Sequence, residues 1–167
     1  MIFAGAVYGI YKLSSQNPIP EIGESFSTEG RDHVADGTKV EYKTNPPTSG
    51  SHYAIPSNWG IIGHEIPDEA AVHNLEHGGV WISYKPDISD SAKKKLEEIA
   101  KSGGGKILMT PRAKNDRDLA AVSWGRVYKF DLNQDGSFDE SAVKNFIKKY
   151  KNTGPEQVPD NMPGKAY

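Results

Sequence analysis

Between residues 80 and 151, strand-like and helix-like segments alternate, and this order restricts the possible folds strongly. Short apolar runs at residues 80–84, 106–110 and 119–130 have the composition of buried strands. Residues 89–102 and 139–151 instead carry their apolar side chains at helical spacing. The order is therefore β-α-β-β-α. The first two strands are expected to be parallel because a helix connects them, and the next pair to be antiparallel, which predicts a mixed sheet of about four strands.

The first half of the chain contains a long segment rich in proline, glycine, serine and asparagine, at residues 44–60. Long loops in compact domains are usually functional, and we expect this one to be ordered and to fold over one end of the sheet. Residues 67–77 are predicted as the central helix, because Pro67 and two acidic residues begin it and a Gly-Gly pair follows it. A short strand is predicted at residues 39–43. The chain is long enough to bury a core as a single α+β domain.

The absence of cysteine limits the chemistry of the chain. It excludes disulfides, thiolate metal sites and cysteine nucleophiles, so a metal ion must be held by histidine, carboxylate or methionine. The formal net charge of −2 excludes the strongly basic surface that is typical of nucleic-acid-binding proteins. We therefore expect no nucleic-acid partner.

The histidines are the most informative residues for function, because all five lie in the first half of the chain. His73 and His77 are spaced i, i+4 on the predicted central helix, which places their rings on one face about 6 Å apart. His52 lies in the Pro/Gly-rich loop, and His33 lies on another loop nearby in sequence. We predict a transition-metal site with His52, His73 and His77 as ligands and His33 as the fourth. The alternative is that these histidines only form hydrogen bonds that fix loops and a helix surface.

Copper is favoured over zinc as the ion. Nitrogen-rich sites bind Cu²⁺ most tightly among the divalent metals of this row. A cysteine-free site outside the cytoplasm would also meet oxidised copper. Met109 and Met162 offer soft ligands for Cu(I), although methionines at such positions are more often packing residues.

Glu76 lies between the two helix histidines, in the pattern H-x-x-E-H (His73 to His77). In inverted zinc proteases the glutamate of this pattern is a general base beside a metal-bound water. The pattern therefore leaves a metal-dependent hydrolase or oxidase with Glu76 as base as an alternative function. An ion pair is a further alternative for this carboxylate, and we favour a role in orienting an imidazole by hydrogen bonding.

The first 13 residues are apolar apart from Lys12, and a polar, proline-containing segment follows. As a helix they would rise only about 20 Å, which is short of a bilayer core, so they resemble a membrane anchor or signal whose beginning is missing. We expect an anchor or truncated signal at residues 1–13, a linker at 14–31 and a globular domain at 32–167. The protein would then be attached to a membrane and extracytoplasmic, at the cell surface or in the periplasm. A buried N-terminal helix is the alternative.

Several motifs of the chain occur together in one known family. They are Asp32 to Val34 (DHV), Asn45 to Tyr53 (NPPTSGSHY), Trp59-Gly60, Val72 to Val80 (VHNLEHGGV), Ser123 to Arg126 (SWGR), Phe146-Ile147 and Gly154 to Glu156 (GPE). In these motifs the chain resembles domain of unknown function family 3105, which comprises exported or membrane-anchored bacterial and archaeal proteins. The resemblance extends from about residue 30 to about residue 160. It implies an N-terminal membrane segment, and its histidine positions correspond to His33, His52, His73 and His77. It implies no function, so a non-catalytic cell-envelope interaction domain with unknown protein partners is a third possibility.

Overall fold

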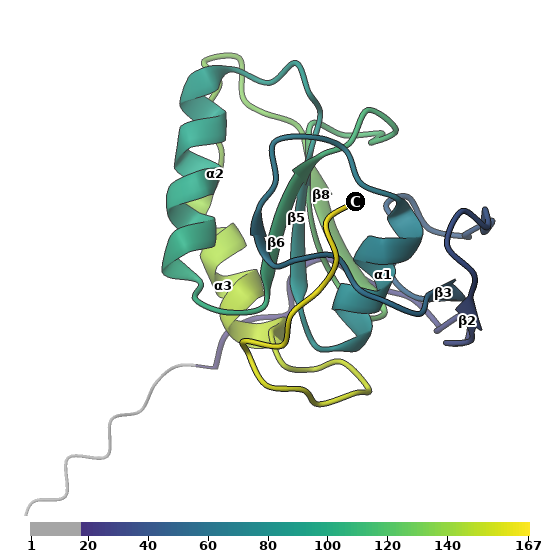
Figure 1. Ribbon diagram of the computed structural model, residues 1–167. Coiled ribbons are helices and arrows are strands. Elements are labelled where there is room, and N and C mark those ends of the chain that lie inside the picture. The colour runs from purple at the N-terminus through teal and green to yellow at the C-terminus, as the bar shows by residue number, and fades with distance from the viewer. Residues whose placement is uncertain (1–17) are drawn as a thin grey trace, which may run out of the picture.

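The computed structural model describes residues 18–167 (Figure 1). The anchor or signal predicted at residues 1–13 lies outside this part of the chain. Within residues 18–167, no helix has both the length and the apolar character needed to cross a bilayer. Residues 18–31, which we expected to be a linker, run along the domain, where β1 (Glu24–Ser25) pairs with β8 (Arg126–Phe130).

A mixed sheet of six strands forms the centre of the described domain, which confirms the α+β class. The strands lie in the spatial order β1, β8, β7 (Leu119–Ser123), β5 (Val80–Tyr84), β6 (Ile107–Pro111) and β4 (Gly60–Ile61). Strands β5 and β6 are parallel, as predicted from the helix between them. Strand β7 is antiparallel to both β5 and β8, and β4 is parallel to β6.

Three details of the predicted sheet are wrong. Residues 119–130 form a hairpin and not one strand, because Trp124 and Gly125 turn the chain, with Gly125 at φ +70. Strand β7 pairs with β5 and not with β6, whose other edge is taken by β4. Residues 39–43 form no strand, because their backbone bonds to side chains: Val40 N–H donates to the Glu69 carboxylate and Lys43 N–H to that of Glu29.

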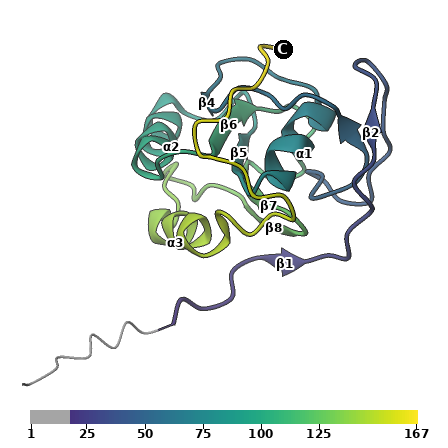
Figure 2. The same ribbon diagram turned by 60° about the horizontal axis from the view of Figure 1, so that its bottom comes forward.

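The helices cover the two faces of the sheet unequally (Figure 2). Helices α2 (Asp90–Ser102) and α3 (Glu140–Tyr150) lie on one face, where alternate side chains of β5, including Val80 and Ile82, join their apolar sides. Helix α1 (Asp68–Glu76) lies on the other face, against Trp81 and the residues that share its side of the sheet. The period of two along β5 therefore divides the apolar residues into two clusters.

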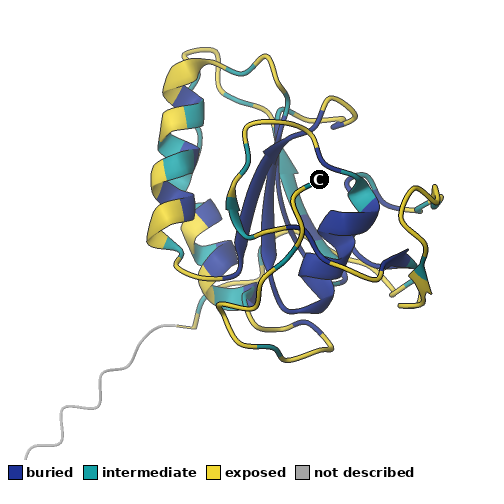
Figure 3. Ribbon diagram, in the orientation of Figure 1, coloured by how far each residue is buried: buried dark blue, intermediate teal, exposed yellow. Residues whose placement is uncertain are grey.

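Helix α1 is buried on almost every side, although it has only 9 residues (Figure 3). The chain from residue 31 to residue 60 covers its outer side. Two short parallel strands in this segment, β2 (His33–Val34) and β3 (His52–Tyr53), place His33 directly opposite His52. The segment from residue 31 to residue 60 therefore packs polar side chains against α1 and shields the histidines of the helix from solvent.

Candidate metal centre

The C-terminal end of α1 places three titratable side chains in the interior: His73 and Glu76 on the helix and His77 at its C-cap, each 3% exposed. The helix ends at a Gly-Gly pair for two physical reasons. Gly78 has φ +81, a conformation that favours glycine. A Cβ on Gly79 would lie 2.5 Å from the ring of Trp59, so any side chain here would force the helix end away from its neighbour.

His52 is fully buried, and both of its ring nitrogens face oxygen atoms. Nδ1 lies 2.7 Å from the carbonyl oxygen of Gly50. Nε2 lies 3.0 Å from Glu76 Oε2. Since a carbonyl only accepts, Nδ1 carries a hydrogen, and the lone pair of a neutral ring therefore points at the carboxylate. Two acceptors at this distance require a proton or another cation between them.

His73 has the same orientation as His52. Its Nδ1–H donates to the carbonyl oxygen of Tyr53 at 2.6 Å, and its Nε2 lies 2.9 Å from Nε2 of His77. A neutral His73 therefore accepts the Nε2–H of His77. Burial lowers the pKa of His73 to about 4, and burial also lowers the pKa of His77. His73 Nε2 therefore carries no proton of its own at neutral pH, and its lone pair can bind an ion in place of the hydrogen bond from His77.

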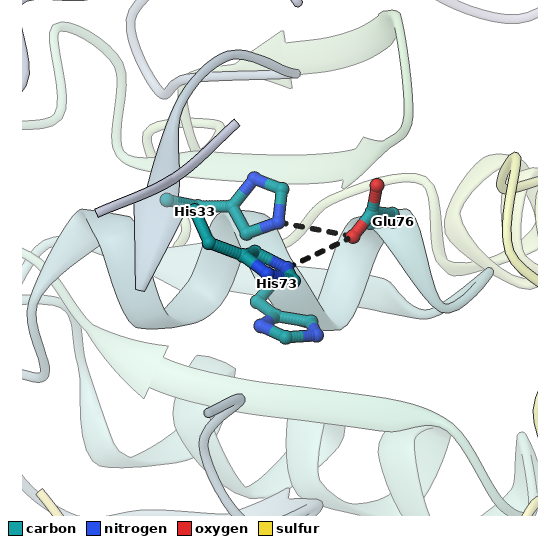
Figure 4. A group of neighbouring side chains, drawn as sticks. His33, His73 and Glu76 are labelled. Atoms are coloured by element: carbon teal, nitrogen blue, oxygen red, sulfur yellow. Dashed lines mark hydrogen bonds and ion pairs between the residues drawn. The ribbon is translucent and has the colours of Figure 1, made fainter. Parts of the chain in front are cut away.

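His33 forms the solvent side of the cluster. Its side chain is 51% exposed, and its Nε2 lies 3.9 Å from Glu76 Oε2. The ring stacks on that of His73, with centroids 5.1 Å apart. Figure 4 shows that the dashed contacts converge on the carboxylate of Glu76.

The residues fall into two overlapping groups that could hold a metal ion. In each group, one ligand atom from every residue lies within 4.8 Å of the others. The first group consists of His33, His52, His73 and Glu76, and the second of His73, Glu76, His77 and Glu156. Ligands about 2.0–2.1 Å from one ion are roughly 3.3 Å apart in a tetrahedral arrangement, so modest side-chain movements would complete either set.

The structure therefore distributes the four predicted histidines differently from the sequence-based proposal. His33, His52 and His73 come together, whereas His77 lies on the other side of His73; in the described chain neither group contains all four. Glu76 joins both groups, and its Oε2 also lies 3.0 Å from Nε2 of His52. The fifth histidine, His64, contacts the carbonyl of Tyr167 and belongs to neither group.

Glu156 was not predicted as a ligand, although it belongs to one of the motifs that resemble the family. Its backbone N–H donates to the carbonyl oxygen of Glu76, and its Oε2 lies 3.5 Å from His77 Nε2. The preceding Gly154 packs directly on the end of α1, where a Cβ would overlap the backbone of Glu76 and Gly78. The motif Gly154-Pro155-Glu156 is the available sequence signal, because such a turn fixes the residue that follows it.

The depressed pKa of His73 predicts how the stability of the metal-free domain depends on pH. The unfolded ring takes up a proton near pH 6.5, whereas the folded ring does so only near pH 4. Unfolding therefore binds protons in this interval, and the free energy of unfolding should fall by about 1.4 kcal/mol for each pH unit below 6.5. Urea denaturation in the presence of a chelator at pH 7, 6 and 5 measures the slope. The variant His73→Gln should reduce it, and a free energy that is flat from pH 7 to 5 would contradict the assignment.

A family model described as "Protein of unknown function (DUF3105)" matches residues 33–162. This range includes every residue of both groups. No curated protein and no solved structure matched the chain.

Proposed function

The chain belongs to the DUF3105 family, whose function is not known, and we propose that it is a transition-metal-binding domain. The ion is held by His52, His73 and Glu76 inside the domain and by His33 at its surface. Copper is the favoured ion, and zinc is the alternative. His77, which the sequence pattern suggested as a ligand, is not part of this set.

One observation carries the proposal: two buried imidazoles have their Nδ1–H groups bound to backbone carbonyls. The Nε2 lone pairs of His52 and His73 are thereby fixed before any ion arrives. Metal-binding histidines usually donate their second nitrogen in this way, because the bond fixes both the tautomer and the ring orientation. A purely structural pair of histidines does not need two lone pairs beside a buried carboxylate.

The donor set favours copper. Three imidazoles and one carboxylate suit either tetragonal Cu²⁺ or tetrahedral Zn²⁺, and in such a set copper is bound more tightly. Of the two methionines considered as soft ligands, Met109 is buried in the apolar cluster beside α2 and α3, on the other face of the sheet. Imidazole and carboxylate ligands without the sulfur of Met109 suit Cu²⁺ better than Cu(I).

Metal binding fits the site better than the hydrolytic alternative does. A general base must face the water that it activates. Glu76 instead directs Oε2 at His52 and belongs to both candidate ligand groups. As a ligand, its carboxylate would be committed to the ion.

We also propose that the domain works outside the cytoplasm, attached to a membrane by its N-terminal segment. The apolar sequence of residues 1–13 supports this location. Fractionation of cells that express the full-length chain, followed by protease treatment of intact cells, tests it. The domain should stay with the membrane fraction and be cleaved from outside.

The decisive test of metal binding uses protein purified without a histidine tag. We expect elemental analysis to find about one copper or zinc ion per chain, and the chelated protein to recover it with a Kd of about 1 µM or tighter. Electron paramagnetic resonance of the Cu²⁺ form should show hyperfine coupling to imidazole nitrogen. The variant His64→Ala, which alters a histidine outside both groups, is the matched control and should bind normally. Failure to bind either ion at micromolar concentration would refute the proposal.

A further inference from the structure

His77 and Glu156 remain unexplained by a site composed of His52, His73, Glu76 and His33. They complete the second group, which shares His73 and Glu76 with the first. His77 is buried, whereas the side chain of Glu156 is 50% exposed. The second group therefore connects the buried site with the surface.

His77 is a poorer ligand than the two buried imidazoles beside it. Its Nδ1 is buried and has no hydrogen-bond partner within residues 18–167. In the metal-free protein this is tolerable, because the ring donates Nε2–H to His73 and leaves Nδ1 without a hydrogen. Binding an ion through Nε2 would move the hydrogen to Nδ1, where no acceptor is available. His52 and His73 carry no such penalty, since carbonyls accept their Nδ1–H groups.

The two groups cannot both be filled without conflict. Only Nε2 of His73 can bind a metal ion, because Nδ1–H donates to the carbonyl of Tyr53, so this ring can serve one ion at a time. Two divalent ions would also bring four positive charges to a site with two carboxylates, Glu76 and Glu156. One divalent ion matches the charge of this pair.

The exposed side chains on the two sides of the site differ in charge. On the side of His33, the exposed group is the guanidinium of Arg31. This side chain is 62% exposed and lies 4.0 Å from Oε1 of Glu76, the carboxylate that His33 also contacts. Its positive charge disfavours the approach of a cation there. On the side of His77, the exposed group is the carboxylate of Glu156, which attracts a cation.

We propose that His77 and Glu156 form a transfer position through which a divalent transition-metal ion enters and leaves the buried site. This inference rests on the proposed metal-binding function and assigns it a purpose: reversible delivery of the ion. During transfer, His73 and Glu76 stay bound while bonds to His77 and Glu156 replace those to His33 and His52. The ion keeps its charge, and no electron is transferred. The hydrogen of the His77 ring moves from Nε2 to Nδ1 as the ion arrives and returns as it leaves.

Exchange kinetics test the proposal. Copper quenches tryptophan fluorescence, and the ring of Trp124 lies 6.2 Å from that of His52, so stopped-flow fluorescence can follow the ion. The association rate is measured with excess Cu²⁺, and the release rate at chelator concentrations high enough that the rate no longer depends on them. A residue that binds the ion only during its passage between solvent and the buried site changes the association rate and the release rate by the same factor. We expect Glu156→Gln to lower both by about tenfold and to leave Kd within about threefold of the wild-type value.

Glu98→Gln is the matched control, because it removes the same charge from the exposed surface of α2 and should leave both rates unchanged. His77→Gln is the second variant and should also slow both rates. Unaltered rates in Glu156→Gln would overturn the transfer position while leaving the metal site intact. A weaker Kd caused by faster release alone would make Glu156 a permanent ligand and would also overturn it. A wild-type protein that binds no metal would refute both proposals.

Discussion

Replacing His52 with alanine is expected to weaken metal binding by about 100-fold or more, and to destabilise the metal-free domain by about 3 kcal/mol. The loss of affinity follows from the removal of a fixed lone pair. The loss of stability has a separate cause. Glu76 is 3% exposed and lies 3.0 Å from the His52 ring, so the variant leaves a buried carboxylate without its nearest partner. An uncompensated buried charge is among the most destabilising changes that a single substitution can make.

A second substitution separates these two effects. The double variant His52→Ala/Glu76→Gln has the same cavity as His52→Ala but no buried charge. It should therefore be more stable than His52→Ala alone in urea denaturation with a chelator present. Neither variant should bind copper tightly. If the double variant were no more stable than the single one, the cavity and not the unpaired carboxylate would account for the loss.

The parts of the fold that the sequence predicted well are those set by local patterns. Helix α1 has acidic residues in its first turn and glycines after its end, and β5 and β6 are parallel because a helix connects them. The hairpin of β7 and β8 was not predicted, because the sequences of its two strands form one nearly continuous apolar segment. Only the Trp124-Gly125 turn interrupts that run. Residues 39–43 alternate like a strand, but carboxylates from elsewhere in the chain take their backbone N–H groups.

In the candidate site, too, contacts set by a local pattern were predicted and contacts between distant parts of the chain were not. Spacing along one helix was enough to bring His73 and His77 together, and their rings lie 4.3 Å apart. The position of His33 depends on parallel pairing with His52, and that of Glu156 on a turn that packs on Gly78. Neither contact follows from a periodic pattern. Helical spacing also gave no information on Nδ1 partners, which distinguish His77 from the other two buried histidines.

The second large effect is expected at Asn74, whose side chain attaches the covering loop to α1. Its Oδ1 accepts a hydrogen bond from the backbone N–H of Ser57, and its Nδ2 donates to the Ser57 carbonyl, both at 2.9 Å. Asn74 and Ser57 are fully buried. In Asn74→Ala, both backbone groups lose their partners in a place that water does not reach. Each such group costs about 1–3 kcal/mol, so we expect a loss of about 3 kcal/mol in the free energy of unfolding.

This loss should also reach the metal site, because the loop that Asn74 holds carries His52. Asn74→Ala leaves every proposed ligand in the chain, and yet its affinity for copper should fall by about tenfold as the loop gains freedom. Asn58→Ala is the matched control: Asn58 is exposed, adjoins Ser57 and forms no side-chain hydrogen bond within residues 18–167. Urea denaturation and copper titration of both variants provide the comparison. Normal copper affinity in an Asn74→Ala protein of reduced stability would mean that His52 is held in place without the loop, by its own bonds to Gly50 and Glu76.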